Sequence, residues 1–223
     1  MINATVQRQN MVESQIRPCE ISDRRVTSAM EEIPREEFVP LAMRPIAYFD
    51  GEVRLKTARP GESVRGLMAP RTFAKLLQLA DIANHDVVLD VGCATGYSAA
   101  VIARIAETVV ALEEDSELAE LAVETTRKLS LDNLVVVTGE LASGYPSEGP
   151  FDAIILEGAV QTIPPILLDQ LKDGGRLVAV VENGPVSRAV LWRRYGEQYD
   201  ETPAFEASCL KLPGFEAAKT FEF

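Results

Sequence analysis

The stretch Val87–Tyr97 reads VVLDVGCATGY and decides the fold of this chain. Its first half is a short apolar run rich in β-branched residues, which is typical of a strand buried on both faces of a parallel sheet. Its second half carries Gly92 and Gly96, which allow the backbone to turn sharply before a helix begins. We therefore expect a strand, a tight turn and a helix, the unit from which doubly wound α/β domains are built.

The same alternation of apolar strands and amphipathic helices continues along the chain. Further strands are expected at 108–113, 134–138, 151–156 and 175–182, and a closing pair at 189–195 and 205–210. Helices are expected at 97–106, 118–129 and 164–171. This order predicts an α/β fold with a doubly wound, mostly parallel, Rossmann-like sheet and right-handed crossovers.

The first 80 residues have a different character. Helical patterns cover 4–16, the segment from the Ser22-Asp23 cap to 32, and 70–80. The stretch 34–66 is rich in proline and glycine, so we expect irregular structure with a short strand at 52–55. We divide the chain into an N-terminal helical extension, residues 1–80, and a cofactor-binding domain, residues 81–223, packed as one compact unit.

Composition narrows the class of protein. With 47% hydrophobic and 25% charged residues, the 223-residue chain resembles an ordinary soluble globular protein. It has no apolar run long enough to span a bilayer and no secretory signal, so we expect a cytoplasmic protein without a membrane partner. The three cysteines are far apart and form no CxxC pair, which indicates neither disulfides nor a metal site.

Charge is unevenly distributed along the chain. Residues 1–80 carry twelve basic and ten acidic residues, a net charge of +2, whereas residues 81–223 carry ten and twenty-four, a net charge of −14. The acidic part would repel phosphates, so we expect no nucleic-acid partner. The mildly basic first third is the better place for an anionic substrate.

A cofactor site is expected at the carboxyl ends of the first two sheet strands, where doubly wound sheets bind ligands. Gly92 and Gly96 let the backbone approach a ligand, and Glu113 ends the next strand, where a carboxylate can accept hydrogen bonds from both ribose hydroxyls. The spacing disfavours a dinucleotide, because Tyr97 occupies the place of the third glycine of GxGxxG.

This region resembles the class I S-adenosylmethionine-dependent methyltransferases, whose first motif is typically (V/L)(D/E)xGxGxG. Asp90, Gly92 and Gly96 match it, and Ala94 replaces the middle glycine. The stretches FDAII at 151–155 and LKDGGRL at 171–177 match later motifs. The resemblance implies S-adenosylmethionine as cofactor, with Glu113 at the ribose and Glu140 at the adenine. The full set of predicted cofactor contacts is Asp90, Gly92, Cys93, Ala94, Gly96, Tyr97, Glu113, Glu114, Glu140 and Leu141.

A more specific resemblance lies in the first third. The stretches MVESQI at 11–16, DRRV at 23–26 and IPREEFVP at 33–40 are similar to the N-terminal region of protein-L-isoaspartate O-methyltransferases. That family methylates the abnormal carboxylate of isoaspartyl residues, which implies a protein or peptide carboxylate as substrate. A carboxylate is ionised at neutral pH, so the reaction needs orientation more than a general base.

The family's TISQP-like loop is replaced here by GLMAP at 66–70. Met68 stands where the family has serine, and neighbouring Arg65 is a candidate to clamp the acceptor carboxylate by bidentate hydrogen bonds. Glu157, expected just past the fourth strand, is a candidate to orient the acceptor. Met68, Arg65 and Glu157 are thus the predicted catalytic residues. Two alternatives stay open: a methyltransferase with a small-molecule acceptor, and a cofactor-binding protein without catalysis.

Overall fold

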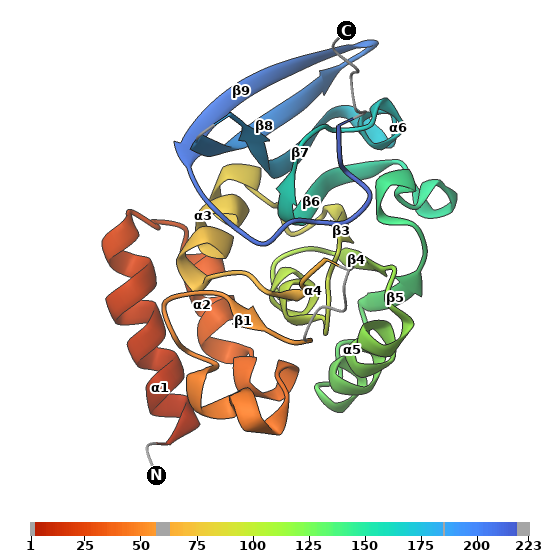
Figure 1. Cartoon of the computed structure of the whole chain (residues 1–223). Coiled ribbons are helices and arrows are strands. Elements are labelled where there is room, and N and C mark those ends of the chain that lie inside the picture. The colour runs from red at the N-terminus through yellow and green to blue at the C-terminus, as the bar shows by residue number, and fades with distance from the viewer. Residues whose placement is uncertain (1–2, 57–62, 185, 218–223) are drawn as a thin grey trace, which may run out of the picture.

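A seven-stranded sheet forms the centre of the computed structural model, which describes residues 3–56, 63–184 and 186–217 (Figure 1). The strand order is β5-β4-β3-β6-β7-β8-β9, with β3 to β7 parallel and β8 and β9 added antiparallel at one edge. The strands are β3 (Val87–Val91), β4 (Thr108–Glu113), β5 (Leu134–Thr138), β6 (Phe151–Val160), β7 (Leu171–Asn183), β8 (Val186–Tyr195) and β9 (Gln198–Glu206). The predicted fold class is confirmed, and β3 lies at the switch point between β4 and β6.

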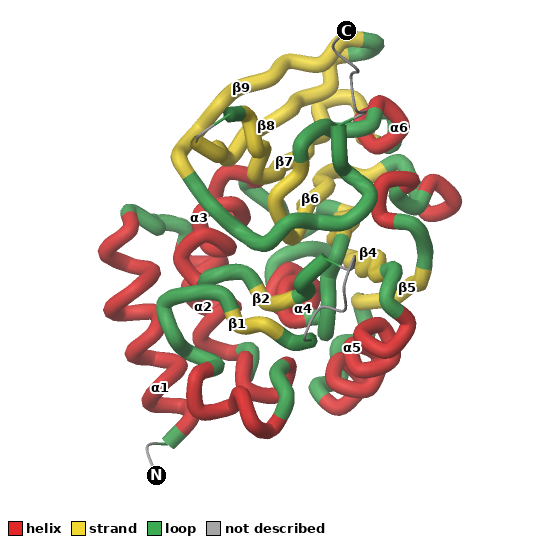
Figure 2. The backbone as a smooth tube through the Cα atoms, viewed as in Figure 1, coloured by secondary structure: helices red, strands yellow, loops and turns green. Residues whose placement is uncertain are grey.

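The helices begin where the sequence offers caps. Asp23 accepts a hydrogen bond at the start of α2, Asp115 caps α5, and Pro70 takes the first position of α3. The helices are α1 (Ala4–Met11), α2 (Arg24–Glu32), α3 (Pro70–Ala80), α4 (Tyr97–Ile102), α5 (Ser116–Lys128) and α6 (Pro165–Leu168). Short π and 3₁₀ turns are η1 (Val12–Ile16), η2 (Arg17–Cys19), η3 (Arg35–Phe38), η4 (Leu41–Ile46), η5 (Leu141–Ser143) and η6 (Pro146–Glu148). Figure 2 shows the helical N-terminal part beside the sheet, with the small β1 (Val53–Arg54) and β2 (Gly66–Leu67) hairpin between them.

The core has two parts, one on each face of the sheet. Neighbouring strand residues alternate between them: Val88 packs in the cluster that contains the N-terminal helices, and Leu89 packs in the other. Met11 and Met30, from the N-terminal extension, are fully buried in the first cluster. The extension and the sheet therefore share one core, while the division into residues 1–80 and 81–223 stays a prediction.

The C-terminal strands differ from those expected. The last strand lies at Gln198–Glu206 rather than at 205–210. It is an edge strand whose residues are mostly exposed, so it lacks apolar alternation, and its Pro203 is tolerated only because one side has no partner strand. β6 extends four residues beyond the predicted Leu156, with an irregularity between Ile155 and Ala159. Glu157 therefore lies inside β6, not after it.

No helix within residues 3–56, 63–184 and 186–217 has the length and apolar character required to cross a membrane.

Candidate functional site at the carboxyl ends of β3 and β4

The turn after β3 is held in a conformation that favours glycine. Gly92 and Gly96 have φ angles of 83° and 89°, and Ala94 between them has φ 51°. A Cβ atom at Gly96 would lie 3.0 Å from Cβ of Ala122 on α5, so this glycine permits close helix packing as well as the turn. The Gly92 amide donates to the carbonyl of Leu112 at 2.8 Å, which fastens the turn to β4.

Glu113 ends β4 beside this turn, as the sequence spacing predicts. Its side chain is fully buried, and both carboxylate oxygens accept hydrogen bonds. Oε2 accepts from the Ala94 amide and from Nη2 of Arg65, each at 2.7 Å. Oε1 accepts from the amides of Glu114 and Asp115 at 3.0 and 3.1 Å. The structure thus brings the predicted ribose acceptor to the glycine turn, and it also brings Arg65 there.

Asp90 lies on β3 below the turn and is fully buried. One carboxylate oxygen accepts a hydrogen bond from Oγ of Ser98 at 2.6 Å, and the other has no hydrogen-bond partner within the described residues. Loss of solvation raises the pKa of Asp90 to about 7, against the lowering effect of the Ser98 hydrogen bond, and the charge of Glu113 adds to the rise.

A buried arginine supports the turn from the N-terminal side. Arg35 has no exposed surface; its Nε and Nη2 donate to the carbonyls of Ala47 and Met68, both at 2.8 Å. Its guanidinium lies 4.6 Å from the centre of the Tyr97 ring, a cation–π contact. Burial lowers the pKa of Arg35. The prediction from sequence missed this role, although Arg35 lies within the family-like stretch 33–40.

Two predicted catalytic residues line a small cavity next to the turn. Met68 and Glu157 border it together with Arg35, Cys93 and Tyr97, and its volume is about 10 Å³, roughly that of one water. One carboxylate oxygen of Glu157 is buried without a partner among the residues that the structure describes. Burial, followed by the nearby Asp90 carboxyl, raises the pKa of Glu157. The third candidate, Arg65, is directed to Glu113 instead.

Of the remaining predicted cofactor contacts, Leu141 lies next to the glycine turn, whereas Glu140 and Glu114 are exposed to solvent. Leu141 is fully buried, with Cδ1 3.6 Å from the point where a Gly92 Cβ would lie. Glu140 is exposed, and its carboxylate accepts a hydrogen bond from Ser143 at 2.8 Å within the same loop. Glu114, the residue that follows β4, is also exposed to solvent.

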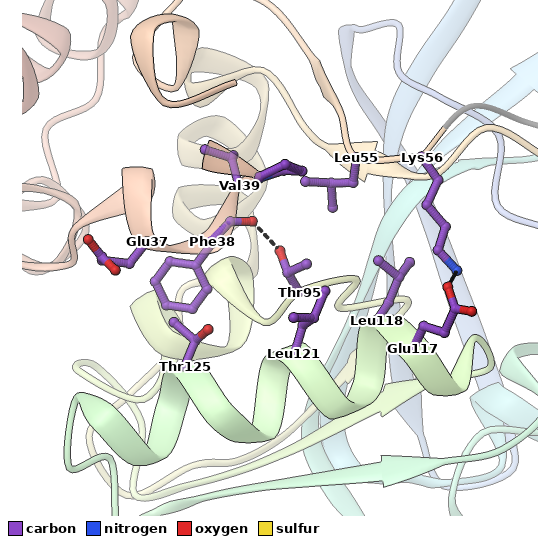
Figure 3. Close-up of a pocket in the computed structure, with 11 residues that line it drawn as sticks. Glu37, Phe38, Val39, Leu55, Lys56, Thr95, Glu117, Leu118, Leu121 and Thr125 are labelled. Carbon is purple, nitrogen blue, oxygen red and sulfur yellow. Dashed lines mark hydrogen bonds and ion pairs between the residues drawn. The ribbon is translucent and has the colours of Figure 1, made fainter. Parts of the chain in front are cut away.

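A larger cavity, about 340 Å³, lies on the other side of the turn, between α5 and the segment that contains η3 and β1 (Figure 3). Thr95 of the turn donates to the Phe38 carbonyl at 2.6 Å at its back, and Lys56 pairs with Glu117 at 2.7 Å at its rim. The remaining wall is mainly apolar. Its lining residues are Glu37, Phe38, Val39, Pro40, Leu55, Lys56, Thr95, Glu117, Leu118, Leu121 and Thr125. None of these was predicted as a site residue.

The space at Gly92 is too small for the expected cofactor while these side chains keep this arrangement. Ligand pockets for molecules of this size measure roughly 300–1,000 Å³, whereas the cavity at Gly92 measures about 10 Å³. Leu212 packs over the turn, and its Cδ2 occupies the space that a Cβ atom at Gly92 would need. The glycine turn and the carboxylate are present, but they are covered by Leu212 and Arg65. The stretch 205–212 resembles the family in sequence, but its contact with Gly92 could not be predicted, because that contact is made through the tertiary fold.

Comparisons with known proteins agree with this architecture. A protein-L-isoaspartate O-methyltransferase of Methanoculleus marisnigri is 39% identical over 175 residues, 78% of this chain and 77% of that protein. The enzyme of Koribacter versatilis is 34% identical over 207 residues, 93% of this chain and 90% of that protein.

Solved structures of protein-L-isoaspartate O-methyltransferases have a similar fold. One protein-L-isoaspartate O-methyltransferase matches with a TM-score of 0.80 at 25% identity, over 93% of this chain and 66% of that one. A Plasmodium falciparum structure in complex with S-adenosyl-L-homocysteine matches with a TM-score of 0.76 at 20% identity, over 95% of this chain and 99% of that one, which supports the fold. The family model for protein-L-isoaspartate(D-aspartate) O-methyltransferase matches residues 6–204. The chain therefore belongs to this family of S-adenosylmethionine-dependent methyltransferases, as its sequence motifs predicted.

Proposed function

We propose that this chain transfers a methyl group from S-adenosylmethionine to the isoaspartyl carboxylate of a damaged protein or peptide. The observation that carries the proposal is the family match over residues 6–204, which includes both the N-terminal block and the turn after β3. The position of Glu113 beside the Gly92 turn supports it, because this is where a ribose-binding carboxylate is required.

The chemistry of the acceptor suits the residues of the chain. An isoaspartyl carboxylate is ionised at neutral pH, so the protein need not supply a general base. The single histidine, His85, has a side chain that is 78% exposed and lies before β3. Met68 and Glu157 border the small cavity at the turn, and we propose that they face the acceptor. We place the reaction in the cytoplasm, with which the free cysteines Cys19, Cys93 and Cys209 agree.

The test is methyl transfer from labelled S-adenosylmethionine to a synthetic peptide that contains one isoaspartyl residue. The matched control is the same peptide with ordinary aspartate. We expect base-labile methyl ester on the isoaspartyl peptide alone. Absence of transfer at millimolar cofactor, from protein that unfolds cooperatively and binds the cofactor, would rule out isoaspartyl methylation and leave a different acceptor or a cofactor-binding protein without catalysis.

A further inference from the structure

Glu113, the carboxylate predicted to bind the ribose, is already engaged by a cation of the same chain. Arg65 is 8% exposed, and its Nη2 lies 2.7 Å from Oε2 of Glu113 and 3.0 Å from the carbonyl of Gly92. The Arg65 carbonyl accepts from the Leu55 amide at 3.0 Å, beside the paired strands β1 and β2, which fixes the residue in place. A ribose at Glu113 would have to replace a charged donor with neutral hydroxyls, in a setting where an ion pair is stronger than in water.

The space over the glycine turn is filled by the segment that follows β9. Its Leu210 carbonyl accepts from the Ala159 amide, and its Leu212 amide donates to the Ala159 carbonyl, both at 2.8 Å, so the segment is pinned to β6. Figure 1 shows this segment crossing the front of the sheet on its way from β9 toward α6. Leu212 is 3% exposed and packs on Gly92 and Gly158.

These two obstructions are parts of one connected unit. Leu210 Cδ1 lies 2.8 Å from the point where a Cβ of Gly66 would be, and the Leu210 amide donates to the carboxylate of Glu52 next to β1. The hairpin that carries Arg65 and the segment that carries Leu212 therefore support each other. The family model matches residues 6–204, and this segment lies after the matched part.

We propose that the chain holds its own cofactor site closed, with Arg65 in the ribose position and Leu212 over the glycine turn. S-adenosylmethionine then binds only the fraction of molecules in which both have withdrawn, and its apparent affinity is reduced by that fraction. The inference rests on the proposed function, because it concerns access to the same site. It assigns Arg65 a role different from the clamp on the acceptor that its sequence position predicts.

Titration calorimetry with S-adenosylhomocysteine tests the closure in the full chain. Leu212→Ala and Arg65→Ala should each bind at least tenfold more tightly than the unaltered protein. Leu76→Ala is the matched control for Leu212, because Leu76 is equally buried in α3 but belongs to the other core cluster. Arg71→Ala is the control for Arg65: its side chain is 51% exposed and 3.9 Å from Asp50. Both controls should bind within about twofold of the unaltered protein.

Each outcome decides the question. Arg65→Ala can lose stability, because it leaves Glu113 buried without its ion-pair partner. Thermal unfolding must therefore show that this variant is folded. Leu212→Ala keeps the ion pair between Arg65 and Glu113 and so tests the closure independently. Equal or weaker binding by folded variants overturns the closure and leaves the proposed function standing. Absence of binding by every variant overturns the closure as well, since opening should restore the site. Tighter binding without methyl transfer to the isoaspartyl peptide supports the closure and removes the proposed function.

Discussion

The buried carboxyl of Asp90 makes the stability of this protein depend on pH. The pKa of Asp90 is raised to about 7 in the folded chain, whereas an unfolded aspartate titrates near about 3.9. Between these values the native state holds a proton that the unfolded state has lost. The contribution of this group to stability is therefore complete below about pH 4 and is lost as the pH rises to about 7.

Asp90→Asn should remove this dependence. Asparagine can still accept the hydrogen bond from Ser98, so the variant gains stability relative to the unaltered protein as pH rises, by at most about 1.4 kcal/mol per pH unit. Urea unfolding at pH 5, 6.5 and 8 measures the difference. Asp132→Asn, on an exposed turn, is the control. A difference that stays constant across the three pH values would contradict the raised pKa.

Substitution of Arg35 should strongly reduce the free energy of unfolding, because its side chain makes several buried contacts. It joins two carbonyls from separate segments, Ala47 and Met68, and stacks on Tyr97 in a fully buried position. Arg35→Ala should cost roughly 3–5 kcal/mol, because it leaves buried acceptors unpaired and a cavity behind. Arg44→Ala should cost less than about 1 kcal/mol, since its pair with Glu37 is exposed. Chemical denaturation of both variants tests this; equal losses would mean that Arg35 does not support the turn.

At the scale of elements, Arg176 fastens helix α3 to the sheet. From β7 it donates to the carbonyls of Ala80 and Asp81, the last of α3 and its cap, and also to the carbonyl of Asp152 on β6. It forms a buried ion pair with Asp86 as well. These contacts satisfy carbonyls at the end of α3 that have no partner within the helix.

Arg176→Met should therefore destabilise the fold strongly. The methionine keeps most of the side-chain volume but leaves Asp86 charged and buried, which costs roughly 3–5 kcal/mol. Arg188→Met on β8 is the control, because its pair with Glu206 is exposed and 3.7 Å apart. Urea midpoints at pH 7 compare the two. If Arg176→Met lost no more than Arg188→Met, α3 would be held by packing alone.

A structural feature could be predicted from the sequence where a short stretch of neighbouring residues determines it, and could not be predicted where it depends on contacts between distant parts of the chain. The strands β3 and β4 were located correctly because parallel strands in the centre of a sheet are continuous apolar runs. The edge strand β5 was located as well, because its LVVVT run is β-branched. β9 was misplaced because an exposed edge strand has no such pattern. In the site, Glu113 was predicted correctly to lie beside the Gly92 turn, because the length of the connecting helix and of β4 sets the number of residues between them. The covering of Gly92 by Leu212 depends on the path of the chain after β9, which no local pattern encodes.

At the scale of the whole molecule, the N-terminal extension is part of the core rather than an addition to it. The apolar faces of α1, η1 and α2 are buried against one another and against α3 and α4, with five side chains no more than 1% exposed: Met11, Val12, Ile16, Met30 and Ile33. Burying a side chain of this size contributes roughly 1.5–3 kcal/mol. Their combined loss, roughly 8–15 kcal/mol, is as large as the whole stability of a typical domain, about 5–15 kcal/mol.

The fragment 81–223 should therefore not fold alone, although it contains all seven strands of the sheet. It would also lose α3, whose Phe73, Leu76 and Leu77 pack in the same cluster. We expect a broad, non-cooperative urea transition and weak near-ultraviolet circular dichroism, where the full chain gives one sharp transition. Adding the fragment 1–80 in excess should restore part of the native signal, because the two pieces bury each other's apolar faces. A sharp transition from 81–223 by itself would instead establish two domains that meet at residue 80.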